Sequence, residues 1–147
     1  KAVDGLIVGH RLMAADEPEL ALKAYYRAAA QYGASVDVLS AIGSANLALG
    51  RLGQAEQILR RAIEADENFV PAWNNLGVVL METGEVAEAS RVFKTAFALD
   101  SGQSDSIREN LRLALAKVEN PAYDAGNEEK FALVRRGQGE YLLITKH

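Results

Sequence analysis

Small residues recur in this chain at a fixed interval of 34 residues, and this repeat constrains the fold more than any other feature of the sequence. Glycine keeps the interval in one register and alanine in two others, at Gly9, Gly43, Gly77, Ala21, Ala55, Ala89, Ala28, Ala62 and Ala96. Larger residues keep it at Tyr25, Leu59 and Phe93. A period of this length indicates stacked helix-turn-helix units, each too thin to bury its apolar face without a neighbour.

The repeat divides most of the chain into three helical hairpins. The predicted units are 2–35, 36–69 and 70–103. In the third unit, the apolar residues from Trp73 to Leu80 are three or four positions apart and share one helical face. Gly77 and Ala89 are small where the two helices of this hairpin are expected to cross. The turn between the two helices holds Asp16, Gly50 or Gly84 in the three units, and glycine there favours a helix end.

The residues after the third unit change character twice. Residues 104–120 have apolar residues at helical spacing and predict a capping helix, with Ser106 and Glu109 as a capping box. Residues 121–147 predict a linker and a β-hairpin, with strands over 131–135 and 141–145 and a glycine-rich turn over 136–140. Because an isolated hairpin is marginal in water, it either docks on its own helices, pairs with another chain or remains disordered.

Composition excludes several classes of function. The 147 residues carry a net charge of −4, which argues against a nucleic-acid partner. The sequence has no cysteine, so it predicts no disulfide, no thiol chemistry and no cysteine-ligated metal. A nucleophile elbow, a phosphate-binding loop and a zinc-binding His-Glu-x-x-His motif are all absent. We therefore predict a non-enzymatic protein without cofactor or metal, which meets a membrane only through a lipid anchor that this sequence lacks.

The repeated residues resemble the tetratricopeptide repeat family. The family pattern of Trp-x-x-Leu-Gly followed by Ala-x-x-x-Phe-x-x-Ala is matched in the third unit by Trp73, Leu76, Gly77, Ala89, Phe93 and Ala96. The resemblance covers about residues 2–103. It implies an all-α fold, a helical-hairpin solenoid of three repeats plus the capping helix, followed by the short β-hairpin.

The same resemblance implies a concave groove that holds a peptide segment of a partner protein. The residues expected to contact this peptide are Leu6, His10, Met13, Ser40, Ser44, Leu47, Asn74, Val78 and Met81. Family members that bind chaperone tails carry Lys and Arg for a terminal carboxylate, but the corresponding positions here are Leu6, His10, Ala41, Pro71 and Asn75. This argues against a chaperone tail. Small residues in the middle of the groove predict that a bulky partner side chain, or the chain's own tail, fills it.

A narrower resemblance concerns the segments 72–80 and 106–116 together with the β-prone tail. They are similar to the tetratricopeptide lipoproteins of bacterial tight-adherence (Flp) pilus assembly and secretion, which are anchored through a lipidated cysteine. This resemblance implies a location at the cell envelope, where the protein is membrane-anchored in the periplasm, and the alternative is cytoplasmic.

Two other functions remain open alongside a peptide-binding module. The chain is either a cytoplasmic scaffold or a structural subunit that forms a homodimer through its hairpin edge or its first unit. A subunit of an enzyme whose chemistry lies in another sequence is the weakest alternative.

Overall fold

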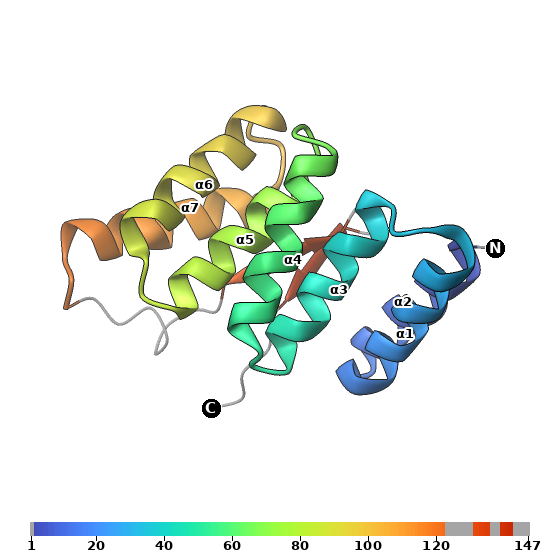
Figure 1. Ribbon diagram of the computed structural model, residues 1–147. Coiled ribbons are helices and arrows are strands. Elements are labelled where there is room, and N and C mark those ends of the chain that lie inside the picture. Colours follow the sequence, from blue (N-terminus) through green and yellow to red (C-terminus); the bar gives the residue numbers. More distant parts are fainter. Residues whose placement is uncertain (1, 123–130, 136–138, 143–147) are drawn as a thin grey trace. The chain divides into compact units, whose positions relative to one another are not determined.

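The computed structural model describes residues 2–122, 131–135 and 139–142, and it is mainly helical (Figure 1). These residues form seven helices followed by one pair of strands. They group into two compact units, residues 1–69 and 70–147. The expectation of an all-α helical-hairpin fold is therefore confirmed, and the short strand pair is a minor addition.

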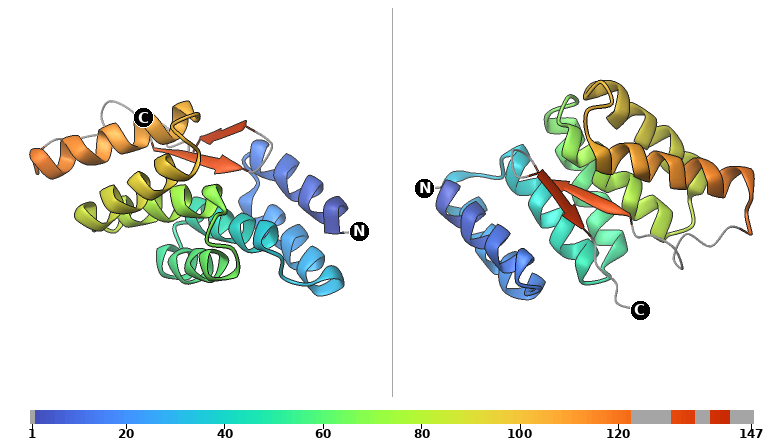
Figure 2. Two further views of the ribbon diagram at one scale, coloured as in Figure 1. Left: turned by 90° about the horizontal axis from the view of Figure 1, so that it is seen from above. Right: turned by 180° about the vertical axis from the view of Figure 1, so that it is seen from behind.

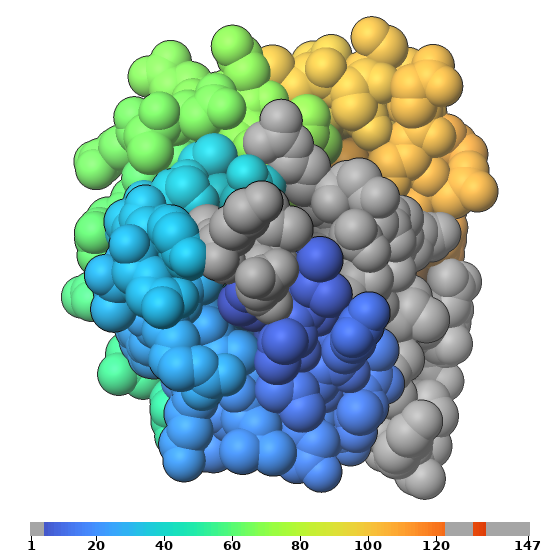
Figure 3. All heavy atoms as spheres, turned by 90° about the vertical axis from the view of Figure 1, so that its right-hand side faces the viewer, coloured from blue at the N-terminus to red at the C-terminus, as the bar shows by residue number. Residues whose placement is uncertain are grey.

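The first unit contains two helical hairpins. Its helices are α1 (Ala2–Ala14), α2 (Pro18–Tyr32), α3 (Val36–Ala48) and α4 (Leu52–Ala65). α1 packs against α2, α3 packs against α4, and α2 also contacts α3. Pro18 begins α2, as expected for a residue whose missing N–H is harmless in the first turn of a helix. Figure 3 shows the surface of α1 and α2 in blue. Tyr26 and Tyr32 of α2 are half exposed.

The second unit contains one further hairpin, an additional helix and the two strands. Its elements are α5 (Val70–Glu82), α6 (Val86–Leu99), α7 (Asp105–Glu119), β1 (Ala132–Arg135) and β2 (Gly139–Leu142). α6 contacts both α5 and α7, and β1 contacts both α5 and α7 (Figure 2). β1 and β2 are antiparallel, with Leu133 opposite Tyr141. Of the alternatives predicted for the tail, docking is the one observed, because β1 packs on helices of its own chain.

The helices of each hairpin approach closely at the repeated glycines. A Cβ placed on Gly77 would lie 2.4 Å from the ring of Phe93, and one on Gly43 would lie 2.5 Å from the side chain of Leu59. Gly9 faces Tyr25 in the same way. The small and large residues of the 34-residue repeat are therefore contact partners, because each glycine leaves room for the large residue of the next helix.

The turns of the hairpins use the left-handed backbone region. Gly50 has φ 77° and Gly84 has φ 86°, as expected from their place after a helix. Asp16 holds the equivalent position in the first hairpin and has φ 62°. A non-glycine residue here carries a conformational cost, although aspartate tolerates this region better than most residues.

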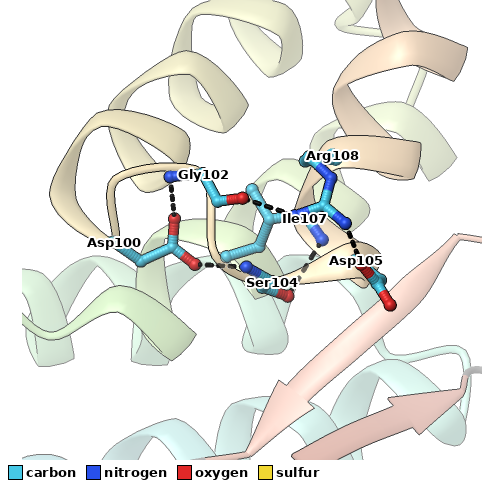
Figure 4. A network of polar contacts seen from close by, with 6 residues as sticks. All are labelled: Asp100, Gly102, Ser104, Asp105, Ile107 and Arg108. Carbon is cyan, nitrogen blue, oxygen red and sulfur yellow. Dashed lines mark hydrogen bonds and ion pairs between the residues drawn. The ribbon is translucent and has the colours of Figure 1, made fainter.

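Two local predictions need correction. The capping box at Ser106 and Glu109 is wrong, because Ser104 caps α7 and its Oγ accepts a hydrogen bond from the Ile107 N–H at 3.2 Å (Figure 4). Ser106 lies one residue inside the helix, where its side chain is buried. The turn predicted over 136–140 is also too long, because Gly139 and Glu140 already belong to β2. Positions 143–145 of the second predicted strand lie outside the described residues.

No helix in the described part of the chain combines the length and the apolar character that a membrane span requires.

Candidate functional site

Three asparagine side chains lie together in the second unit and form its most concentrated polar site. Asn74 and Asn75 come from α5, and Asn110 comes from the facing side of α7. The Asn110 Nδ2 donates to the Asn74 Oδ1 at 2.9 Å, and the Asn74 Nδ2 donates to the Asn75 Oδ1 at 3.1 Å. All three side chains are buried. We call this cluster, Asn74, Asn75 and Asn110, the asparagine site.

The asparagine site binds the main chain of β1. Asn75 accepts from the Val134 N–H at 2.8 Å and donates to the Val134 carbonyl at 3.0 Å. Asn110 does the same with Ala132, at 2.8 Å and 2.6 Å, and Asn74 donates to the Ala132 carbonyl at 2.8 Å. Asn75 and Asn110 thus each present one donor and one acceptor to a single residue, as a neighbouring strand would, while Asn74 adds one further donor.

The bound residues alternate along β1, which explains why the pairing fits a strand. In an extended chain, successive residues direct their N–H and C=O groups to opposite edges. Ala132 and Val134 direct theirs to the asparagines. Leu133 is paired with Tyr141 of β2, on the other edge. β1 therefore lies between a true strand on one edge and a row of amide side chains on the other.

Apolar contacts hold the same segment in place. Leu133 is fully buried (0% exposed), and Phe131, just before β1, is 8% exposed. The ring of Phe131 stacks on Phe93 of α6, with centroids 6.1 Å apart and planes 9° apart. The site thus combines recognition of the main chain with burial of two bulky side chains at alternate positions.

Six of the predicted contact residues lie in the first unit. They are Leu6, His10 and Met13 in α1, and Ser40, Ser44 and Leu47 in α3. His10 Nδ1 and the Tyr25 hydroxyl share a hydrogen bond of 2.7 Å, with the two rings in edge contact. The Ser44 hydroxyl donates to the Ser40 carbonyl at 3.2 Å. These polar groups have partners within their own unit, and their contact with a peptide stays a prediction.

The other three predicted contact residues lie on α5. Asn74 is the one that belongs to the asparagine site, while Val78 is buried and Met81 is half buried. From the sequence, Asn75 is only a position where a cation for a terminal carboxylate is missing. In the structure it forms a two-point contact with Val134.

Asn110 is not among the residues predicted from the sequence. A signal was present, because Asn110 falls between Ile107 and Leu111 on the apolar side of a helical pattern. An amide at such a position must find a hydrogen-bond partner once it is buried. The partner, Ala132, lies 22 residues further along the chain, so helical spacing alone does not reveal it.

The described residues contain no cluster of histidine and acidic side chains with the geometry of a metal site. Their ion pairs lie at the surface, among them Arg51 with Glu19 and Arg60 with Glu56. Exposed pairs of this kind contribute little to stability. The contacts of the asparagine site with Ala132 and Val134, by contrast, join uncharged amide and main-chain groups.

Comparison with known proteins identifies relatives over part of the chain. A family model described as "Tetratricopeptide repeat" matches residues 12–76 and 46–106. Tetratricopeptide repeat protein 7B of Homo sapiens is 42% identical over 53 residues, which is 36% of this chain and 6% of that protein. Cellulose synthase operon protein C of Komagataeibacter xylinus is 35% identical over 69 residues, which is 47% of this chain and 5% of that protein. The chain thus spans a small fraction of the length of these relatives.

Solved structures share the fold at low sequence identity. The Sgt2 TPR domain from Aspergillus fumigatus superposes with a TM-score of 0.77 at 22% identity, covering 94% of this chain and 91% of that one. The first TPR of Spaghetti (RPAP3), bound to an HSP90 peptide, gives 0.76 at 15% identity, covering 82% and 97%. The TPR2B domain of yeast Sti1, in complex with an Hsp70 peptide, gives 0.72 at 22% identity, covering 79% and 97%.

Proposed function

Since this chain belongs to the tetratricopeptide repeat family, we propose that it is a non-catalytic interaction module whose asparagine site binds an extended segment of a partner protein. The observation that carries the proposal is the set of amide contacts to the main chain of Ala132 and Val134. A segment bound in this way is recognised by its extended backbone, with apolar side chains adding affinity. Solved relatives of this fold, in complex with HSP90 and Hsp70 peptides, support a peptide as the partner class.

The proposed partner differs from an acidic chaperone tail. A terminal carboxylate that leaves water needs a cationic partner, because an unpaired buried charge is costly. The positions that would supply one hold Leu6, His10, Ala41, Pro71 and Asn75. The asparagine site instead offers neutral donors and acceptors, which match a peptide backbone.

The proposal is tested with a chain whose asparagine site is emptied. Leu133 is fully buried, so Leu133→Asp places a carboxylate where no water reaches and should expel β1 from the site. The probe is a fluorescent, end-blocked nine-residue peptide with the sequence of residues 128–136, Glu-Glu-Lys-Phe-Ala-Leu-Val-Arg-Arg. Fluorescence anisotropy should report binding to the full chain that carries Leu133→Asp.

Two of the three asparagines are then replaced in the same background. Asn75→Ala with Asn110→Ala deletes the two-point contacts and should weaken peptide binding about tenfold or more. Asn46→Ala is the matched control, since the Asn46 amide is also buried but donates to the Ile42 carbonyl of its own helix. Peptide affinity that is unchanged by Asn75→Ala and Asn110→Ala would exclude the asparagine site as the binding surface.

The machinery that the module serves is a second part of the proposal. The resemblance of residues 72–80 and 106–116 to pilus-assembly lipoproteins supports a partner in the tight-adherence pilus or secretion apparatus, at the cell envelope. Fractionation of cells that produce the full-length protein tests this, and recovery of all the protein with the cytosol would contradict it. The homodimer through the hairpin edge also remains a proposal, and sedimentation of the chain with and without residues 121–147 tests it.

A further inference from the structure

We propose that residues 131–135 are a displaceable internal ligand of the asparagine site, and that the natural partner is an extended segment with the same bulky–small–bulky apolar pattern that exchanges with them. This inference rests on the proposed function. It adds the chemistry of the partner and the way in which access to the site is controlled.

The polar contacts between the asparagine site and β1 are indifferent to sequence. Five hydrogen bonds join the asparagines to N–H or C=O groups of Ala132 and Val134. Any extended segment presents the same groups at the same spacing of two residues. A partner strand can therefore replace β1 without leaving a buried amide unpaired, which would be the main cost of an empty site.

The side chains of residues 131–133 indicate which partner segments fit the asparagine site. Phe131 and Leu133 are two residues apart, so their side chains lie on the same face of the extended segment. Leu133 is fully buried and Phe131 stacks on Phe93, while Ala132 between them is buried with a small side chain. A partner should therefore present an aromatic residue, a small residue and a branched aliphatic residue in that order.

β1 gains little stability from the hairpin that it forms with β2. A two-stranded hairpin by itself is marginal in water, so β1 and β2 depend on the contacts of β1 with α5 and α7. β1 contacts α5 but is not part of the helical hairpin that α5 forms with α6. Its covalent connection to α7 gives it an effective concentration in about the millimolar range. The apparent affinity for an added segment then falls in proportion to the fraction of chains whose site is open.

The test compares the wild-type chain with variants that weaken the internal ligand. The anisotropy probe with the sequence of residues 128–136 should bind the wild-type chain about tenfold or more less tightly than the Leu133→Asp chain. Phe131→Ala, a milder change that keeps Leu133 in place, should give an intermediate affinity. It also decides the result if Leu133→Asp does not fold. Equal affinity of the wild-type and weakened chains would overturn the inference.

A control peptide tests the pattern of side chains. It has the same composition, but Ala and Leu are exchanged, which gives Glu-Glu-Lys-Phe-Leu-Ala-Val-Arg-Arg. This exchange puts Phe and Leu on opposite faces of an extended segment, so no shift of register brings both to the buried positions. The control peptide should bind the Leu133→Asp chain about tenfold or more less tightly than the probe does. Equal binding of the two peptides would overturn the proposed partner chemistry.

Exchange itself is observed through the amide hydrogens of Ala132 and Val134. Their N–H groups are bonded to Asn110 and Asn75, so hydrogen exchange at these two amides should be slow in the free wild-type chain. Saturation with unlabelled probe should make both amides exchange faster, because the internal strand has left the site. Probe that binds while both amides stay protected would show that the strand is a fixed part of the fold, and would overturn the inference.

The same measurements separate the two proposals. If the probe binds the Leu133→Asp chain and depends there on Asn75 and Asn110, the proposed function stands, whatever the wild-type chain does. If that dependence is absent, the proposed function fails together with the inference. In the wild-type chain, Asn75→Ala with Asn110→Ala weakens the internal strand and the probe alike. The apparent affinity should therefore change much less there than in the Leu133→Asp background.

Discussion

Single glycines decide how closely the two helices of each hairpin approach. Gly9, Gly43 and Gly77 each face a large side chain of the following helix. The chain varies the large residue, from Tyr25 to Phe93, while the glycine stays the same. The constraint therefore comes from the space that the backbone leaves, and only the size of the packed side chain matters at the other position.

Gly77→Ala should destabilise the protein. The added Cβ would lie 2.4 Å from a ring carbon of the buried Phe93, so ring or helix must shift, at a cost of about 1–3 kcal/mol. Gly53→Ala is the control, because a Cβ on that helical glycine meets nothing within 4 Å. This control should stabilise by about 0.5–1 kcal/mol through helix propensity. Urea unfolding measures both, and equal effects of the two substitutions would contradict the packing argument.

At the scale of elements, the start of α7 is set by its own local contacts. The Asp100 carboxylate accepts hydrogen bonds from the N–H groups of Gly102 and Ser104 at 2.9 Å and 3.0 Å. Arg108 contacts the Gly102 carbonyl and the Asp105 carboxylate (Figure 4). The turn between α6 and α7 is thus ordered by side chains that bond to nearby backbone, and this fixes where α7 begins.

Ser104→Ala should destabilise the second unit by about 1 kcal/mol, because the Ile107 N–H loses its cap. Ser106→Ala is the matched control. The buried Ser106 hydroxyl oxygen has no hydrogen-bond partner, so its loss should be neutral or slightly stabilising. Thermal unfolding of both variants provides the comparison. A larger loss for Ser106→Ala would restore the capping box that the sequence suggested.

The elements differ in how far the sequence predicts them. Six helices follow from the 34-residue repeat, because the helical spacing within each unit depends on residues close in sequence. The cap of α7 was misplaced because two serines, Ser104 and Ser106, fit a cap almost equally well. The asparagine site was only partly predicted, through Asn74. The Ala132 carbonyl, which accepts from Asn74, lies 58 residues further along the chain. This contact therefore depends on tertiary packing, which helical spacing does not encode.

At the scale of the whole molecule, the chain consists of two compact units. The first unit has its own helical core, with Tyr25 and Leu59 fully buried. The second unit contains the asparagine site together with the strand that occupies it. A substitution at the asparagine site should therefore destabilise the second unit more than the first, since each repeat is stabilised mainly by its neighbours.

Leu133→Asp should lower protection from hydrogen exchange in α5 and α7, which contact β1, more than in α1 and α2. The physical reason is that α5 and α7 lose apolar contacts and the hydrogen-bond partners of three buried amides. Hydrogen exchange followed by mass spectrometry resolves the helices separately. Uniform loss of protection in all helices would show that the two units unfold as one.

The absence of charge from the amide contacts to Ala132 and Val134 has a consequence for the conditions under which the module works. Ion pairs at a surface weaken as dissolved ions screen them, whereas contacts between uncharged groups are hardly affected. A ligand bound through amides and buried apolar side chains should have the same affinity at high salt concentration as in dilute buffer. A module of this design would keep its affinity for the ligand when the salinity of its surroundings changes.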